Sequence, residues 1–332
     1  MSVINTDNRK MLLACDGGGI RGIIIARCLE KLEEIEGSPC HQIFNFMAGT
    51  STGAIIVGAL AIGIPARELV QLYLAKGKEM FKKSSSLWTR YWKYRYTKTE
   101  VKKKFKEIFS DIMLKELPVD IIITAKDTVR GETMFFEKKM FGNMLLREAI
   151  ESSMSAPTYF APNGRYIDGG IGSFNNLCYQ AAVEAIHYLE YPKGRIRLLS
   201  FGTGREINNM KEGEAEKKNK LGWVKYVIGE GMDDANEQQV QLVRRKYATR
   251  GEIEFRRYQL SFTHEVFTKL GIPIEQIKDT SVFKMDAVEY IETLDLVARK
   301  FADYITFTEE YGVELGRKPR LKEKEFQRYL KR

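Results

Sequence analysis

The chain contains little histidine, proline or cysteine, and it has no apolar run long enough to cross a bilayer. Its 332 residues include 3 His, 8 Pro and 4 Cys. So few histidines leave little room for chemistry that uses imidazole as the proton acceptor. The longest fully apolar run, Ala54–Pro65, is shorter than a membrane span. The polar stretch Met1–Lys10 lacks the apolar core of a signal peptide, so we expect a cytoplasmic protein that acts peripherally at the inner membrane surface.

The four cysteines do not have the spacing of a metal site. Cys15 ends a predicted strand and Cys28 lies on a predicted helix, which favours free thiols in the core. The other two are Cys40 and Cys178. We expect neither a metal nor a cofactor.

A five-residue motif, Gly49–Gly53, stands between two apolar runs and reads Gly-Thr-Ser-Thr-Gly. The pattern G-x-S-x-G lifts a serine hydroxyl onto a tight turn between a strand and a helix. Its glycines keep side chains out of the crowded bend. We predict a strand over 44–48, a helix over 52–62, and Ser51 as a nucleophile flanked by Thr50 and Thr52. A purely structural turn is the alternative.

A glycine-rich loop precedes this motif. Residues 16–22 read DGGGIRG, after a predicted strand over 11–15 and before a predicted helix over 23–35. Backbone N–H groups at such a helix start are free to bind a phosphate or an oxyanion. The glycine spacing also fits a dinucleotide site, but the acid that such a site needs about 20 residues later is missing from 43–49. A turn that only permits close packing is a third interpretation.

The third motif is Tyr166–Gly170, which reads YIDGG. Asp168 ends an apolar strand, and Gly169 and Gly170 clear space beside it. Burying a carboxylate is costly unless the group is paired or used in chemistry. An isolated Asp-Gly is more often a turn, but this one follows an unusual run of small and aromatic residues, Ser155–Pro162.

In this order, the three motifs resemble those of the patatin-like phospholipases. The similarity includes SAPTYFAP at 155–162 and FGTG at 201–204, is dense over 10–205, and fades over the last third. The resemblance implies a two-residue centre in which Ser51 is the nucleophile and Asp168 the base. It also implies an oxyanion hole formed by the following residues of the glycine loop: Gly17, Gly18, Gly19 and Arg21.

Histidine chemistry remains an alternative to this pair. His41 precedes the serine, and His187 falls on a predicted helix surface. Only His264 follows a strand-like run in the place of a triad base. A direct Ser-Asp mechanism predicts that Ser51→Ala and Asp168→Ala abolish hydrolysis while His264→Ala retains most of it.

Predicted strands and helices alternate along the chain, which indicates an α/β fold with a mainly parallel central sheet and helices on both faces. Further strands are predicted over 119–125, 133–137, 196–201 and 254–262, and further helices over 66–81, 145–153, 177–189, 223–248 and 282–307. The resemblance implies one patatin-like three-layer domain over 8–332, with a completing layer over 221–332. A small second domain and a charged loop over 208–220 are also compatible with the sequence.

Positive charge is concentrated in segment 76–106, which holds twelve Lys or Arg against two Glu, while the whole chain carries +9. Its aromatic residues are Phe81, Trp88, Tyr91, Trp92, Tyr94, Tyr96 and Phe105. Basic groups and Trp or Tyr favour anionic membrane surfaces. We therefore predict a lid or docking segment over 81–98 that uses Lys82, Lys83, Trp88, Arg90 and Trp92. A solvated loop and base stacking on nucleic acid are the alternatives.

The sequence thus predicts a serine acyl hydrolase that acts on membrane glycerophospholipids. Family resemblance alone adds activation by a cyclic di- or trinucleotide in anti-phage defence. A non-catalytic lipid- or nucleotide-binding module and a dinucleotide-dependent oxidoreductase are the rival functions. No specific nucleic-acid partner is expected, and the sequence leaves the oligomeric state open, a homo-oligomer included.

Overall fold

The computed structural model describes residues 4, 8–80, 96–157, 159–207, 213–273, 275, 277 and 283–316. The predicted docking residues Lys82, Lys83, Trp88, Arg90 and Trp92 lie outside this described part.

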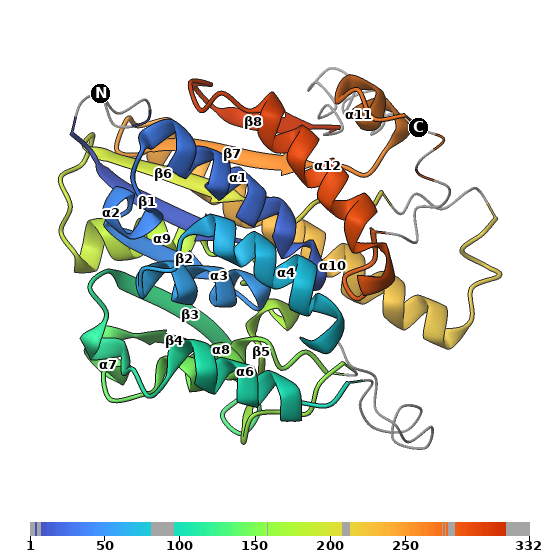
Figure 1. The fold of residues 1–332 in the computed structure, drawn as a ribbon, viewed down its shortest axis with the longest axis horizontal. Helices are drawn as coiled ribbons and strands as arrows, with labels where there is room; N and C mark the ends of the chain where they lie inside the picture. Colours follow the sequence, from blue (N-terminus) through green and yellow to red (C-terminus); the bar gives the residue numbers. More distant parts are fainter. Residues whose placement is uncertain are drawn as a thin grey trace, which may run out of the picture.

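A single mixed sheet organises the described chain (Figure 1). Its strands are β1 (Lys10–Cys15), β2 (Phe46–Gly49), β3 (Asp120–Asp127), β4 (Glu132–Glu137), β5 (Tyr166–Asp168), β6 (Ile196–Phe201), β7 (Glu254–Leu260) and β8 (Gly312–Leu315). The order across the sheet is β4-β3-β2-β1-β6-β7-β8, and β5 also pairs with β3. Neighbouring strands are parallel except that β4 and β5 run antiparallel to β3. The predicted α/β class with a mainly parallel sheet is confirmed.

Helices cover both faces of this sheet. They are α1 (Gly22–Glu36), α2 (Cys40–Ile43), α3 (Thr52–Ala61), α4 (Ala66–Met80), α6 (Thr99–Phe109), α7 (Lys138–Phe141), α8 (Leu146–Ser153), α9 (Cys178–Val183), α10 (Lys220–Val243), α11 (His264–Lys269) and α12 (Ile291–Tyr304). Short 3₁₀ turns are η1 (Gly19–Arg21), η2 (Leu114–Glu116), η3 (Gly169–Ile171) and η8 (Val288–Tyr290). Helices α9 and α10 pass into π-helical turns, η4 (Glu184–Tyr188) and η5 (Arg244–Ala248). Figure 1 shows α1, α4 and α12 side by side on one face.

The alternation of side chains along β1 explains the two cores. Met11, Leu13 and Cys15 pack with residues of α1, α3, α4 and α12. Leu12 and Ala14 point the other way and pack with residues of α9 and α10. Both faces of a parallel strand are buried when helices cover both sides of the sheet, which is why the strand reads as a continuous apolar run.

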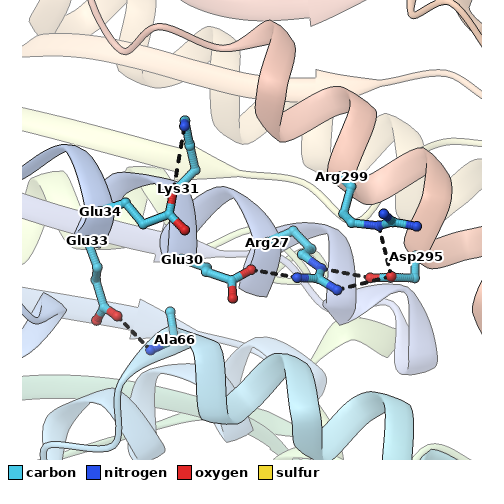
Figure 2. Close-up of polar contacts among 8 residues, drawn as sticks. All are labelled: Arg27, Glu30, Lys31, Glu33, Glu34, Ala66, Asp295 and Arg299. Carbon is cyan, nitrogen blue, oxygen red and sulfur yellow. Dashed lines mark hydrogen bonds and ion pairs between the residues drawn. The ribbon is translucent and has the colours of Figure 1, made fainter.

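The last third of the chain continues the same sheet, because β7 pairs with β6 and β8 pairs with β7. An ion pair connects helix α12 to α1 (Figure 2). The Arg27 guanidinium donates to both carboxylate oxygens of Asp295, at 2.7 and 3.0 Å, and Arg299 reaches the same carboxylate at 3.1 Å. Burial of Leu294, Val297 and Phe301 on the same helix supplies the apolar part of this contact.

Several sequence predictions can now be compared with these elements. The strands predicted over 119–125 and 133–137 are present as β3 and β4, which form an antiparallel hairpin, and the four cysteines are buried and free as predicted. The predicted helix over 282–307 is wrong at its start, because α12 begins at Ile291. Helix α6 and strand β8 were not predicted. No helix in the described ranges has both the length and the apolar character that a bilayer crossing requires.

Candidate active site

The serine of the G-x-S-x-G motif lies at the junction of β2 and α3. Ser51 has φ 55° and ψ −119°, a conformation that a residue with a side chain rarely adopts and that concentrates at functional turns. The bend is so tight that a Cβ on Gly49 would lie 2.3 Å from the Gly53 carbonyl oxygen. A Cβ on Gly53 would lie 2.2 Å from the Cys15 carbonyl oxygen. Glycine is therefore required at both positions, as the motif predicted.

Strand pairing explains how the distant aspartate reaches this serine. Strand β4 occupies one side of β3 from Ile122 to Asp127, and β2 occupies the other side as far as Ile123. Strand β5 pairs antiparallel with β3 from Asp127 back to Ala125, so it must lie on the side of β2, in line with it. The carboxyl ends of β2 and β5 therefore face each other, with Asp168 at the end of β5.

The Ser51 hydroxyl lies beside the Asp168 carboxylate and favours its ionised form. Asp168 is only 5% exposed, and its Oδ1 also accepts the Gly170 N–H at 2.8 Å. Burial raises the pKa of Asp168 from 3.8 to about 6, although the Ser51 hydroxyl and the Gly170 N–H favour the charged form and lower it. The structure thus brings together the two residues that the sequence predicted as nucleophile and base.

The backbone of this pair is held by one short segment at the end of α8. The Ser51 N–H donates to Ser153 Oγ at 2.8 Å. The Asp168 N–H donates to the Ser155 carbonyl at 3.1 Å. Neither serine was singled out from the sequence, where the only signal is their place in a small-residue run just before the aspartate motif.

The glycine loop lies beside the pair, and its N–H groups differ in whether they are already hydrogen-bonded. The Gly17 N–H donates to the Asn175 carbonyl at 3.1 Å, so it is already engaged. In the described part of the chain, the N–H groups of Gly18 and Gly19 have no hydrogen-bond partner. An oxyanion hole in this structure would therefore rest on two amides rather than the three that the sequence predicted.

Arg21 does not point away into solvent but is buried behind the loop. Its Nη1 donates to Glu206 Oε1 at 3.3 Å and to the Phe283 carbonyl at 3.5 Å. Its guanidinium lies over the Phe262 ring, 5.8 Å from the ring centre. Burial lowers the pKa of Arg21, with Glu206 opposing that shift. In this arrangement the arginine fastens the loop to the last third of the chain.

Asn175 is a site residue that sequence reasoning missed. Its Oδ1 is buried without a hydrogen-bond partner among the described residues. A Cβ on Gly17 would lie 2.2 Å from this oxygen, and one on Gly170 would lie 2.7 Å from it. The amide therefore fills the space between the glycine loop and the aspartate turn. An Asn-Asn pair seven residues after Asp168 is the only signal that the sequence offered.

The remaining predicted residues do not gather at this site. His264 is exposed in the first turn of α11, and His187 is exposed in η4, the latter as predicted. Tyr96, Lys98 and Phe105 were counted in the basic and aromatic segment, but all three are buried. Tyr96 and Lys98 fall within the predicted docking segment 81–98, but neither is exposed for docking, and Lys98 is paired inside the protein. Phe105 lies on the side of α6 that faces the core.

Fold and site together define a class of α/β proteins with a serine and a buried carboxylate paired at the carboxyl edge of a mainly parallel sheet. The family model described as patatin-like phospholipase matches residues 13–179. Because this match covers half of the chain and includes all three motifs, the chain belongs to the patatin-like phospholipase family. The resemblance inferred from the motifs is confirmed.

Curated relatives are similar over part of their length. An intracellular phospholipase A2 of Caenorhabditis elegans is 31% identical over 217 residues, which is 58% of this chain and 19% of that protein. A cGAMP-activated phospholipase of Pseudomonas aeruginosa is 29% identical over 176 residues, which is 48% of this chain and 52% of that protein. The chain thus matches between about a fifth and half of the length of these relatives.

Solved structures show a more distant likeness. VipD from Legionella pneumophila matches with a TM-score of 0.43 and 11% identity, over 87% of this chain and 67% of that chain. The ExoU effector of Pseudomonas aeruginosa, solved in complex with SpcU, matches with a TM-score of 0.34 and 15% identity, over 70% of this chain and 52% of that chain.

Proposed function

We propose that this chain is a serine acyl hydrolase of the phospholipase A type, which cleaves fatty acyl esters of membrane glycerophospholipids. The observation that carries the proposal is the contact between the hydroxyl of Ser51, whose backbone is strained, and the buried Asp168 carboxylate. Membership in the patatin-like phospholipase family and the names of the phospholipase relatives support lipid as the substrate class.

The geometry suggests a direct mechanism. Ser51 Oγ attacks the acyl carbonyl carbon and its proton passes to Asp168, which has a pKa of about 6 and is therefore ionised at neutral pH. The N–H groups of Gly18 and Gly19, which have no partner among the described residues, stabilise the negative charge on the carbonyl oxygen. Asp168 then returns the proton to the leaving alcohol or lysolipid. Finally, water activated by the same carboxylate hydrolyses the acyl-enzyme.

The test compares the wild-type chain with Ser51→Ala on vesicles of defined glycerophospholipids. Lipid mass spectrometry is expected to show free fatty acid and lysolipid with the wild type and neither with the variant. A fluorophosphonate probe should label the wild-type chain at Ser51. Intact lipid together with an unlabelled Ser51 would favour the rival function, a non-catalytic lipid- or nucleotide-binding module.

We further propose that a cyclic di- or trinucleotide activates the enzyme in anti-phage defence and that it acts at the inner membrane surface. The support is the cGAMP-activated relative, together with the net charge of +9, which would suit both an anionic ligand and an anionic membrane. Purified protein should be screened with cyclic nucleotides while fatty acid release from vesicles is followed. High activity without any ligand, unchanged by every nucleotide, would exclude this regulation.

A further inference from the structure

A buried ammonium group lies behind the Ser51–Asp168 pair. Lys98 is only 9% exposed. Its Nζ donates to Ser155 Oγ at 2.6 Å and to Glu151 Oε1 at 3.2 Å. Ser155 Oγ in turn donates to the Glu151 carbonyl at 2.5 Å. Lys98 therefore links a side chain on α8 to Ser155, two residues beyond the end of the helix.

The residues that Lys98 holds belong to the segment that positions the predicted catalytic pair. Within Glu151–Ser155, Ser153 accepts the Ser51 N–H and the Ser155 carbonyl accepts the Asp168 N–H. A shift of this segment would change both contacts together. It would move the hydroxyl and the carboxylate relative to each other.

The charge of Lys98 is costly where it lies. Removing an ammonium from water is unfavourable, and burial lowers the pKa of Lys98, although Glu151 opposes the shift. Charge-assisted hydrogen bonds are shorter and stronger than neutral ones, which suits a group that holds a segment in place. Lys102 offers a natural comparison, since it reaches the same Glu151 oxygen at 3.1 Å but its side chain is 56% exposed.

We propose that Lys98 is a positioning residue that sets the Ser51–Asp168 geometry through Ser155 and Glu151. The proposal rests on the hydrolase function proposed above. It predicts that Lys98 acts on turnover and not on the binding of substrate, because it touches neither the substrate nor the reacting atoms.

The test uses a soluble p-nitrophenyl acyl ester, so that binding to a membrane surface does not affect the rate. Lys98→Met keeps most of the side-chain volume and is expected to lower kcat by roughly 10- to 100-fold while KM stays within about threefold, since small misplacements of reacting groups have effects of this size. Lys98→Arg retains a charged donor and should recover part of the loss. Lys102→Met, the matched control, should keep the wild-type kcat.

A second measurement does not depend on activity. Hydrogen exchange in the free protein should become faster at peptides that contain the Ser51 and Asp168 amides in Lys98→Met but not in Lys102→Met. If Lys98→Met does not fold, Ser155→Ala removes the same contact and should lower kcat in the same way. Wild-type hydrolysis that Ser51→Ala abolishes, combined with wild-type kcat and exchange in Lys98→Met, would overturn this role and leave the proposed function intact. Absence of hydrolysis by the wild type would instead refute the function, and the exchange result would still decide whether Lys98 positions the pair.

Discussion

Arg257 and Asp16 form a buried ion pair at the base of the glycine loop. Two guanidinium nitrogens of Arg257 reach the two carboxylate oxygens of Asp16, at 2.9 and 2.5 Å, and Nη1 also donates to Ser200 Oγ at 2.8 Å. Asp16 is the first residue of the loop, whereas Arg257 lies in β7, outside the part of the chain that the family model matches. The loop therefore depends on the last third of the chain.

Removing one partner of this pair should destabilise the protein strongly. Arg257→Met leaves the Asp16 carboxylate buried and unpaired, which is expected to lower the free energy of unfolding by about 3–5 kcal/mol. The control is the double variant Arg257→Met with Asp16→Asn, which leaves no unpaired charge and should recover a large part of that loss. Urea unfolding measures both. Equal losses in the single and double variants would contradict the prediction.

Hydrolysis should depend on the charge of Asp168. The carboxyl group must be ionised to accept the Ser51 proton, and its pKa is about 6. We therefore expect kcat/KM to rise with pH through an apparent pKa near this value and then to level off. The measurement is a pH profile with a soluble ester over a range in which the protein stays folded. A profile that is flat through this region would exclude Asp168 as the base.

The same carboxyl group should make the folded state less stable as the pH rises. The pKa of Asp168 is about 6 in the folded protein, against an ordinary value of 3.8. Between these values the folded state binds a proton that the unfolded state has released, so the free energy of unfolding falls. Asp168→Asn removes this cost and should be more stable than wild type above pH 6, by about 3 kcal/mol at most. Urea unfolding at several pH values should show the difference vanish towards acid pH, and a difference independent of pH would count against burial as its cause.

A second carboxylate beside the pair should shift the pH profile. The side chains of Asn175 and Asp168 both lie next to Gly170. A Cβ on Gly170 would lie 2.7 Å from Asn175 Oδ1 and 3.1 Å from Asp168 Oδ1. Asn175→Asp adds a negative charge at this place, and a nearby like charge raises the pKa of a carboxyl group. The apparent pKa of kcat/KM should therefore move upward relative to wild type. Asn175→Ala serves as the control that removes the amide without adding charge, and it should not produce this shift.

The order of motifs was sufficient to predict the elbow, the glycine loop, the aspartate turn and the class of sheet, because each depends on local backbone geometry and strand alternation. Their partners could not be predicted in the same way. Lys98 and Arg257 look like surface cations in a sequence, and only tertiary packing buries them against Glu151 and Asp16. Helix α12 was predicted too long because apolar spacing continues before it, whereas Ala287, with ψ 60°, departs from helical geometry. Strand β8 has only four residues and gives little periodic signal.

Strands β2 and β5 meet head to head along one side of β3, so the hydroxyl and the carboxylate are delivered by two strand ends that arrive from opposite directions. Their meeting point is set by the pairing ladder of a third strand and not by the length of chain that separates them. Insertions or deletions between these two ends can accumulate over evolution without changing the distance between the paired groups, provided that β3 keeps both neighbours. Such an arrangement would let related proteins vary the surface segments between β2 and β5 while the paired serine and aspartate stay in the same geometry.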